Sequence, residues 1–569
     1  MLLSLYLTER KHTKKASIWD SKGAWFCLAV SIFFLLAGLA FIPRLGIQND
    51  EALFAHAIYE PKECLFVVRL GHSTFPLMEL SYLGTLKAWI YRPIFRILGT
   101  GVFTTRVPVL LAGVASIWIF FLLLRRIAGT RAAVLGSSLL ALDATYLLTI
   151  CFDWGPVALQ HLLLLGGALL LLRFYQEGGE TWLLGGFFLW GLAMWDKALA
   201  IWSLSGFAVA AIAIFPRQIL RVITFRRLAG AGLAFVLGAF PLALYQAKSK
   251  FGTFRENVAR DPGQISARAR YLVNTVRGKG LFDWMVDEDW QTPAPHQPAS
   301  LLERASMQVS EKTGHPRQNL MAYAFVLAVL LAAFARGGAL RAILFALVAM
   351  GVAWLQMAIV ANAGASVHHV VLLWPLPQLV IAVSFAAAAS RFGRAAAPAL
   401  AVVLATLAAS NLLLLNEYFA LATRNGGAFE WTDAIFPLST YLKSMPSSNI
   451  FCVDWGMQNG LLLLNRGKMA LHAGSDPIAK PNLSDDDRAY LAAMISGPDH
   501  VFVAHTEGNE VFQGVNGKLV KFAGEMGYGQ ETMAIVPDSY GRPMFQVYRF
   551  AGRAVLARSQ PAISGSGRR

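Results

Sequence analysis

The stretch GIQNDEALFAHAIYE, residues 46–60, decides how we interpret this chain. It follows a hydrophobic run, residues 25–43, that is long enough to cross a bilayer. Acidic side chains at the mouth of a span cost free energy if they touch lipid, so they indicate a functional site by default. Asn49 or Asp50 could instead only cap a short helix that continues through Ile58. The adjacent carboxylates of Asp50 and Glu51 are more acid than a cap requires, which favours a site.

The composition places the chain in a membrane. Its 569 residues are 56% hydrophobic, and the mean hydropathy is +0.49, which together with so many long apolar runs is not typical of a soluble protein. The net charge of +16 would suit nucleic acid, but many of the Lys and Arg residues lie in short segments between apolar runs, where they set orientation. The four cysteines have neither a CxxC pairing nor a metal-ligand spacing. We therefore predict no nucleic-acid partner and no metal site built on the cysteines.

The apolar runs predict a polytopic α-helical membrane protein with about eleven spanning helices. The N-terminal segment before the first run is basic, and no convincing cleavage site follows that run, so we expect a retained anchor. The predicted spans are 24–43, 107–124, 132–150, 156–172, 181–195, 198–215, 228–246, 319–335, 341–361, 370–390 and 395–415.

Basic residues orient these spans. If the spans simply alternate, the basic N-terminus and the basic short segments between later spans all fall on one side, which is then the cytoplasm. The segments between the remaining spans, and the chain beyond the last span, would face outward. The basic residues used are Arg10, Lys11, Lys14, Lys15, Arg125, Arg126, Arg131, Arg217, Arg221, Arg226, Arg227, Arg336, Arg341, Arg391 and Arg394.

The same pattern divides the chain into regions. Short β-prone runs near 450–453, 500–504, 532–536 and 544–548, with helical segments between them, predict a small α/β domain outside the membrane. Residues 77–98 suit a helix lying in the membrane interface. The expected regions are a cytoplasmic N-terminus at 1–23, a transmembrane domain at 24–416 with outer loops 44–106 and 247–318, an extracytoplasmic α/β domain at 417–558 and a disordered tail at 559–569.

Further candidate residues lie at the outer mouths of spans. Asp153, in CFDWGP, either caps the helix that starts near Pro156 or takes part in the chemistry. Lys197, after Asp196 in GLAMWDKALA, either snorkels to the interface or binds phosphate. Arg106, at the start of the second predicted span, either snorkels to the interface or binds an anion.

Paired histidines, His368 and His369, precede the tenth predicted span. Two histidines alone do not make a metal site, so an interfacial or phosphate-facing role is favoured. The chain has no Walker loop, GxSxG or HExxH motif, and we find no acid in mid-span of the kind that a proton-coupled carrier requires. Together these features favour an enzyme that works at the outer membrane surface.

Several of these stretches resemble those of a known family. An outer-facing Asp50–Glu51 pair directly after the first span is similar to the integral-membrane glycosyltransferases of the GT-C type, most of all the branch with protein O-mannosyltransferases and lipid A aminoarabinose transferases. Arg106-Val107-Pro108 resembles the family's Arg-Leu-Pro, and Asp153 matches its second acidic motif. The stretch around Lys197 is similar to the family's Gly-Leu-Ala…Thr-Lys-Gly. The resemblance covers roughly residues 20–390.

The sequence also departs from the family. Relatives often show Lys-Pro-Pro or His-Pro-Pro in the first outer loop, where this chain has Thr74-Phe75-Pro76, with His72 nearby. Asp196 stands where Thr is usual. These differences lie where the family contacts the donor phosphate, so the resemblance does not identify the sugar that is transferred.

The resemblance implies transfer of a sugar from a polyprenyl-phosphate donor to a glycan, lipid or protein acceptor outside the cytoplasm, in a bacterial inner or plasma membrane. By this reading Asp50 is the general base in a single displacement, with Glu51 and Asp153 as further catalytic carboxylates. Lys197, Arg106, His72, His368 and His369 would bind substrate. No cofactor is implied with certainty, and a divalent cation stays open. The alternative is a non-catalytic flippase for lipid-linked sugars or a polysaccharide-export protein, which internal pseudo-symmetry or mid-membrane charges would favour.

Overall fold

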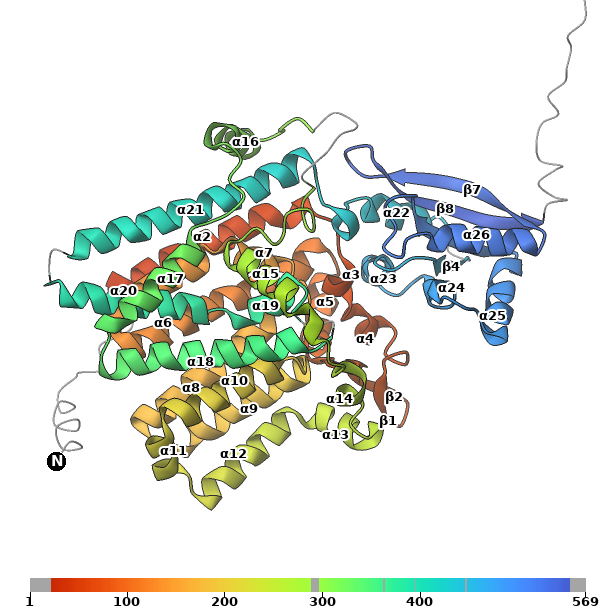
Figure 1. Cartoon of the computed structure of the whole chain (residues 1–569). Coiled ribbons are helices and arrows are strands. Elements are labelled where there is room, and N and C mark those ends of the chain that lie inside the picture. Colours follow the sequence, from red (N-terminus) through yellow and green to blue (C-terminus); the bar gives the residue numbers. More distant parts are fainter. Residues whose placement is uncertain (1–21, 288–295, 362–363, 394–395, 446–447, 553–569) are drawn as a thin grey trace, which may run out of the picture.

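The computed structural model describes residues 22–287, 296–361, 364–393, 396–445 and 448–552. The predicted cytoplasmic N-terminus lies almost wholly outside the described residues, and the predicted disordered tail lies entirely outside them. Within them, a large helical bundle carries a smaller domain with a five-stranded sheet at one end (Figure 1). This arrangement confirms the predicted fold class.

The bundle is built from apolar helices whose side chains pack into a main core and a second, smaller core around Trp195 and Tyr245. In length and composition, 6 described helices could cross a membrane, or up to 8 if each of two bent pairs counts as one span. The predicted number of about eleven is not confirmed, because several predicted spans form helices that are short or sharply bent. The helices are α2 (Lys22–Phe41), α6 (Val102–Ala141), α7 (Ala144–Cys151), α8 (Ala158–Glu177), α9 (Glu180–Asp196), α10 (Ala200–Ile214), α11 (Pro216–Val222), α12 (Phe225–Gly238), α13 (Phe240–Ser249), α17 (Met321–Leu331), α18 (Gly337–Ile359), α19 (Val367–Val370), α20 (Leu376–Arg391) and α21 (Ala396–Arg424).

Two features of the bundle depart from straight spans. Gly129 interrupts α6 with φ 83°, a conformation that glycine adopts without steric cost, so two helical segments follow one another there. The axes of α10 and α11 meet at 99°, and those of α12 and α13 at 80°. Pro216 and Pro241 stand in the first turn of the second helix of each pair, where a missing N–H costs least.

The first outer loop is folded rather than free. After the short η2 (Ile42–Arg44) come α3 (Asn49–Ala52) and α4 (Ala55–Tyr59), then a three-stranded sheet of β1 (Phe66–Leu70), β2 (Ser73–Leu80) and β3 (Leu83–Gly84), and finally α5 (Leu86–Leu98). The predicted interfacial helix over 77–98 is therefore wrong in its first part. Residues 77–80 pair with neighbouring strands, and so short an apolar run does not distinguish strand from helix.

The second outer loop also contains helices. Its described part holds α14 (Gly252–Asn257), η3 (Pro262–Gln264), α15 (Ile265–Val276) and α16 (Leu301–Thr313). A capping box of Ser300 and Glu303 starts α16, since each side chain satisfies the other's backbone N–H. Glu303 also pairs with Arg44 at 2.6 Å, which ties this loop to the end of the first span.

The C-terminal domain has a mixed sheet in the order β5-β4-β6-β8-β7. Strand β4 runs parallel to β5 and β6, whereas β8 is antiparallel to β6 and β7. Four of the five strands overlap the predicted runs; the short β5 was not predicted. Apolar clusters cover both faces. The elements are η7 (Phe429–Trp431), α22 (Ile435–Leu442), β4 (Asn449–Cys452), α23 (Gln458–Asn465), β5 (Ala470–Ala473), α24 (Ser475–Ala479), α25 (Asp485–Ser496), β6 (His500–His505), α26 (Val515–Glu525), β7 (Tyr528–Pro537) and β8 (Pro543–Gly552).

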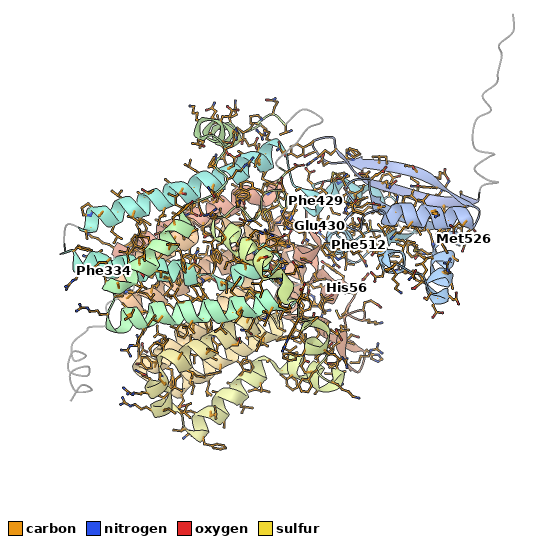
Figure 2. All side chains as sticks on the ribbon, in the orientation of Figure 1. His56, Phe334, Phe429, Glu430, Phe512 and Met526 are labelled. Carbon is orange, nitrogen blue, oxygen red and sulfur yellow. The ribbon has the colours of Figure 1, made fainter. Side chains whose placement is uncertain are left out.

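The segment that links the two parts packs against the first outer loop. Figure 2 shows Glu430 between the bundle and the sheet domain, while Phe334 lies at the far end of the bundle. The N–H of Gly46 donates to the carbonyl of Trp431 at 2.7 Å. A Cβ at Gly46 would lie 1.9 Å from the carbonyl oxygen of Thr432, so only glycine permits this approach. The C-terminal domain thus contacts the residues just before the acidic pair.

Candidate active site

Helix α3 presents the acidic pair at the end of the first span, and a glutamine caps it. The side-chain oxygen of Gln48 accepts hydrogen bonds from the backbone N–H groups of Asp50 at 2.6 Å and Glu51 at 3.3 Å. The alternative in which Asn49 or Asp50 serves only as the cap is therefore wrong. The structure leaves the side chain of Asp50 available for another role.

The two neighbouring carboxylates have opposite environments. Glu51 is 1% exposed, and its oxygens accept from Nε and Nη2 of Arg106 at 2.6 and 2.8 Å. Asp50 is only partly buried, and its carboxylate accepts no hydrogen bond from the described residues. Burial raises the pKa of Asp50, and the nearby ammonium of Lys197 opposes that shift. Within the described part of the chain, Asp50 is thus an unpaired carboxylate with raised proton affinity, near a cation.

Arg106 holds the loop rather than facing an open site. It is 0% exposed and uses all five N–H groups. Two donate to Glu51, and the others donate to the carbonyls of Ile42, Leu45 and Gly46. With every donor of its guanidinium engaged, Arg106 has none left for a phosphate. The geometry therefore does not support the expected substrate-binding role of Arg106. Arg106 instead anchors Glu51.

Asp153 takes the capping role, one of the two that its sequence left open. It adopts φ 43°, a left-handed conformation that Asp tolerates better than most residues. One carboxylate oxygen accepts from the N–H groups of Val157 and Ala158, at 3.0 and 2.9 Å, and so caps α8. The other lies 2.6 Å from Nζ of Lys87. Asp153 is buried and fully engaged, which leaves Asp50 as the better candidate for a base.

Lys197 lies between α9 and α10, close to the acidic residues. It is 3% exposed, and its ammonium donates to the carbonyl of Gly155 at 2.5 Å. Burial lowers its pKa to about 8, against the pull of the charges of Asp50, Asp196 and Asp153. An ammonium has three N–H groups, and the described residues accept from one. The other two can serve an anionic ligand.

The paired histidines lie beside the same loop. His368 packs edge-on against Trp154 with ring centroids 4.5 Å apart, and a Cβ at Gly155 would lie 2.4 Å from the His368 ring. The hydroxyl of Ser366 lies within hydrogen-bond distance of both His368 and His369. The structure therefore brings these histidines next to the loop that Lys197 contacts.

His72 is not brought to this site. It is exposed in the turn between β1 and β2, and within the described ranges it makes no hydrogen bond or ion pair with the other candidate residues. The structure thus collects Asp50, Glu51, Asp153, Lys197 and both histidines around the mouths of α2, α8 and α10, and leaves His72 at the tip of a hairpin.

Sequence reasoning missed several residues that surround Asp50. Glu430 accepts a hydrogen bond from Nε2 of Gln48 at 2.5 Å. Burial raises the pKa of Glu430 to about 8, and the charges of Asp50 and Asp454 act in the same direction. Burial and the charge of Asp50 together raise the pKa of Tyr82 to about 12. No local pattern marks Glu430, because its partner lies 382 residues away in sequence.

The described site residues do not offer a ready cation site. Hard cations such as Mg²⁺ and Ca²⁺ take several oxygen ligands. Glu51 is already paired with Arg106, and Asp153 with Lys87. Of these three carboxylates, only Asp50 has no partner among the residues that the structure describes. A divalent cation at this site stays a prediction.

Comparison with known proteins fits this geometry. The family model of dolichyl-phosphate-mannose-protein mannosyltransferases matches residues 84–244, which include Lys87, Arg106, Asp153 and Lys197. The structure of ArnT from Cupriavidus metallidurans bound to undecaprenyl phosphate aligns with a TM-score of 0.56 at 13% identity, covering 93% of this chain and 98% of that one. The chain has the fold of GT-C glycosyltransferases.

Two further structures are similar. ArnT in the apo state aligns with a TM-score of 0.55 at 12% identity, covering 91% of this chain and 97% of that one. The oligosaccharyltransferase AglB from Archaeoglobus fulgidus, in complex with an inhibitory peptide and a dolichol-phosphate, aligns with a TM-score of 0.47 at 13% identity, covering 95% of this chain and 75% of that one. No curated protein matches the chain in sequence. The family match and the fold together indicate an integral membrane glycosyltransferase.

Proposed function

We propose that this protein transfers a sugar from a polyprenyl-phosphate donor to an acceptor outside the cytoplasm, with Asp50 as the general base. The observation that carries the proposal is the contrast within the acidic pair. Glu51 is locked to Arg106, whereas the carboxylate of Asp50 is partly exposed, near the ammonium of Lys197 and without a partner among the described residues. A general base needs this combination of access and raised proton affinity.

The chemistry follows from these two residues. Asp50 takes the proton of the acceptor hydroxyl or amine as the new glycosidic bond forms, and positive charge develops at the sugar carbon. The bond from that carbon to the phosphate oxygen breaks, and the lipid phosphate leaves as an anion. Lys197 stabilises that anion with the N–H groups that Gly155 does not use. A single displacement of this kind inverts the anomeric centre.

The solved relatives support a donor of this class. ArnT was solved with undecaprenyl phosphate and AglB with a dolichol-phosphate, and the proposed donor belongs to the same chemical class. Its apolar tail would stay in lipid between the spans while its phosphate reaches the mouth of the bundle. Since the C-terminal domain contacts the cap of α3 through Gln48 and Glu430, we place the acceptor between that domain and Asp50.

The location follows from orientation. Because the basic short loops lie on the opposite side from Asp50, we place the site and the C-terminal domain on the outer face of a bacterial inner membrane. The acceptor class (glycan, lipid or protein) is to be found by assay.

A transfer assay tests the proposal. Purified full-length protein is incubated with a panel of radiolabelled polyprenyl-phosphate sugars and cell-envelope acceptors. We expect transfer from one or a few donors, with loss of the label from the lipid. Movement of intact lipid-linked sugar across vesicle membranes without any transfer would support the flippase alternative instead.

A further inference from the structure

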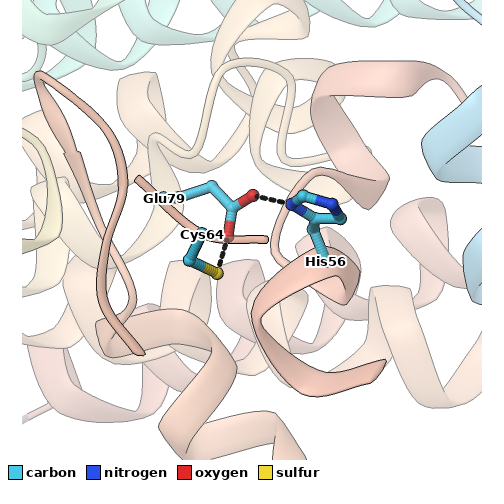
Figure 3. Close-up of side chains that lie close together, drawn as sticks. All are labelled: His56, Cys64 and Glu79. Carbon is cyan, nitrogen blue, oxygen red and sulfur yellow. Dashed lines mark hydrogen bonds and ion pairs between the residues drawn. The ribbon is translucent and has the colours of Figure 1, made fainter. Parts of the chain in front are cut away.

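A second cluster of reactive side chains lies in the first outer loop, apart from the proposed catalytic residues. Figure 3 shows His56, Cys64 and Glu79 converging from α4, from the turn that follows it and from β2. Nδ1 of His56 lies 2.8 Å from one oxygen of Glu79, and Sγ of Cys64 lies 3.3 Å from the other. One ligand atom from each residue lies within 4.8 Å of the others. Three segments therefore meet at one point through groups that all bind metals.

The donor set suits zinc. Zinc takes thiolate sulfur, imidazole nitrogen and carboxylate oxygen with bond lengths of about 2.0–2.3 Å. In a tetrahedral site these bond lengths place the ligand atoms roughly 3.3–3.8 Å apart, so shifts of about 1 Å or less close the observed cluster around an ion. The hard cations Ca²⁺ and Mg²⁺ prefer oxygen ligands alone, which a thiolate and an imidazole do not provide.

Burial also suits a bound ion. Cys64 and Glu79 are 6% and 5% exposed, whereas the side chain of His56 is 22% exposed. The protein surface therefore reaches the cluster from the histidine side, which gives an ion a path of entry. All four cysteines are free, so Cys64 is not committed to a disulfide.

A further carboxylate orients the histidine. Nε2 of His56 lies 3.4 Å from an oxygen of Glu60, one helical turn further on. When Nδ1 of a histidine binds a metal, Nε2 carries the proton and commonly donates to a carboxylate, which fixes the tautomer and the ring. Glu60 stands where such a partner is needed.

We propose that His56, Cys64 and Glu79 bind a zinc ion, with water in the fourth position and Glu60 as the hydrogen-bond partner of His56. The ion would fix α4 to β2. Since α3, which carries Asp50, ends at Ala52 and α4 begins at Ala55, the ion would also set the position of the acidic pair. The inference rests on the loop geometry alone and does not depend on the proposed glycosyl transfer.

Metal analysis of the full-length protein tests this proposal. The protein is purified without a polyhistidine tag, stripped with chelator and reloaded with zinc or cobalt alone. We expect about one zinc ion per chain. Cobalt should give the near-ultraviolet charge-transfer band of a thiolate ligand together with the visible bands of a tetrahedral site. Folded wild-type protein that takes up no zinc, or a cobalt spectrum without the thiolate band, would overturn the proposal.

Variants identify the ligands. Cys64→Ser should abolish the thiolate band, while Glu79→Gln should keep that band but weaken zinc binding. Glu60→Gln should weaken binding by about 10- to 100-fold with the band retained, as expected for a partner of a ligand. The matched controls are Glu63→Gln, which changes an exposed carboxylate next to Cys64, and Cys452→Ser, which changes a buried cysteine in β4. Both should bind like the wild type.

A stability measurement separates zinc binding from a plain hydrogen-bonded cluster. Chelator should lower the melting temperature of the wild type, because an ion that binds only the folded state stabilises it. The same chelator should leave Cys64→Ser unchanged. Equal melting temperatures of wild type with and without zinc would show that His56 and Glu79 form an ion pair with no metal, and would contradict the inference.

Discussion

The ammonium of Lys87 lies 2.6 Å from a carboxylate oxygen of Asp153 and joins the first outer loop to the start of α8. Both side chains are buried, and Lys87 also donates to the carbonyl of Glu51 at 3.3 Å. The second carboxylate oxygen of Asp153 caps α8. This ion pair therefore holds the first outer loop, which carries Asp50, against the start of α8.

Removing either partner of this pair should destabilise the protein. Lys87→Met leaves the buried carboxylate of Asp153 without its cation, and Asp153→Asn leaves the buried ammonium of Lys87 without its anion. Either change should lower the free energy of unfolding by about 3–5 kcal/mol. The double variant should lose less than the sum of the two, with a coupling of about 0.5–3 kcal/mol. Apparent melting temperatures in one detergent measure this. Strictly additive effects would mean that the pair contributes nothing to the fold.

Arg106 provides a test of its anchoring role. Arg106→Gln leaves the buried carboxylate of Glu51 without its cation, so we expect a loss of about 3–5 kcal/mol, visible as a lower melting temperature. Arg126→Gln is the matched control, because Arg126 pairs with Glu177 at an exposed site where such a pair is worth about 0–1 kcal/mol. A stable Arg106→Gln protein with only a raised KM for the donor would restore the phosphate-binding role.

The orientation is testable by cysteine labelling. The four native cysteines are buried, so an impermeant thiol reagent should label the wild type weakly. Ser496→Cys places a thiol on the exposed end of α25, and Thr130→Cys places one in the basic segment after Arg126. In intact spheroplasts we expect labelling of Ser496→Cys and protection of Thr130→Cys until lysis. The reverse pattern would invert the topology.

The pH dependence should show two limbs. Asp50 acts only when ionised, and burial raises its pKa, so kcat/KM should fall on acidification at a pH above the usual carboxyl value of about 4. Lys197 acts only when protonated, and its pKa of about 8 predicts a fall of kcat/KM above about pH 8. Lys197→Arg stays charged throughout and should remove the alkaline limb. An alkaline limb unchanged in that variant would assign it to another group.

The membrane bundle and most strands of the outer domain could be predicted from the sequence because their signals are local. Long apolar runs and alternating strands carry their own periodicity. The acidic pair could also be found, since Asp50 and Glu51 follow a span directly. Local patterns do not show that Asp50 and Glu51 have different roles. That difference depends on Arg106, which lies 55 residues from Glu51 and pairs with it.

Other parts of the site depend on still longer separations. Glu430 reaches Gln48 across 382 residues, and the cluster of His56, Cys64 and Glu79 has irregular spacing that matches no common metal motif. The predicted number of spans exceeds the 6 to 8 candidates among the described helices, because two predicted spans lie wholly or partly within the 40-residue α6 and others form helices that are short or sharply bent. The contact of Glu430 and the cluster around His56 join residues that are distant in sequence, so only the three-dimensional structure shows them.

The most direct measurement is the turnover of Asp50→Asn. Gln48 caps α3, and the Asp50 carboxylate accepts no hydrogen bond from the described residues, so the substitution should leave expression and melting temperature unchanged. Loss of a general base should lower kcat by about a hundred- to ten-thousandfold. Glu51→Gln, by contrast, should lower the melting temperature because it breaks the pair with Arg106. A folded Asp50→Asn protein with near-normal turnover would contradict the assignment of Asp50 as the base.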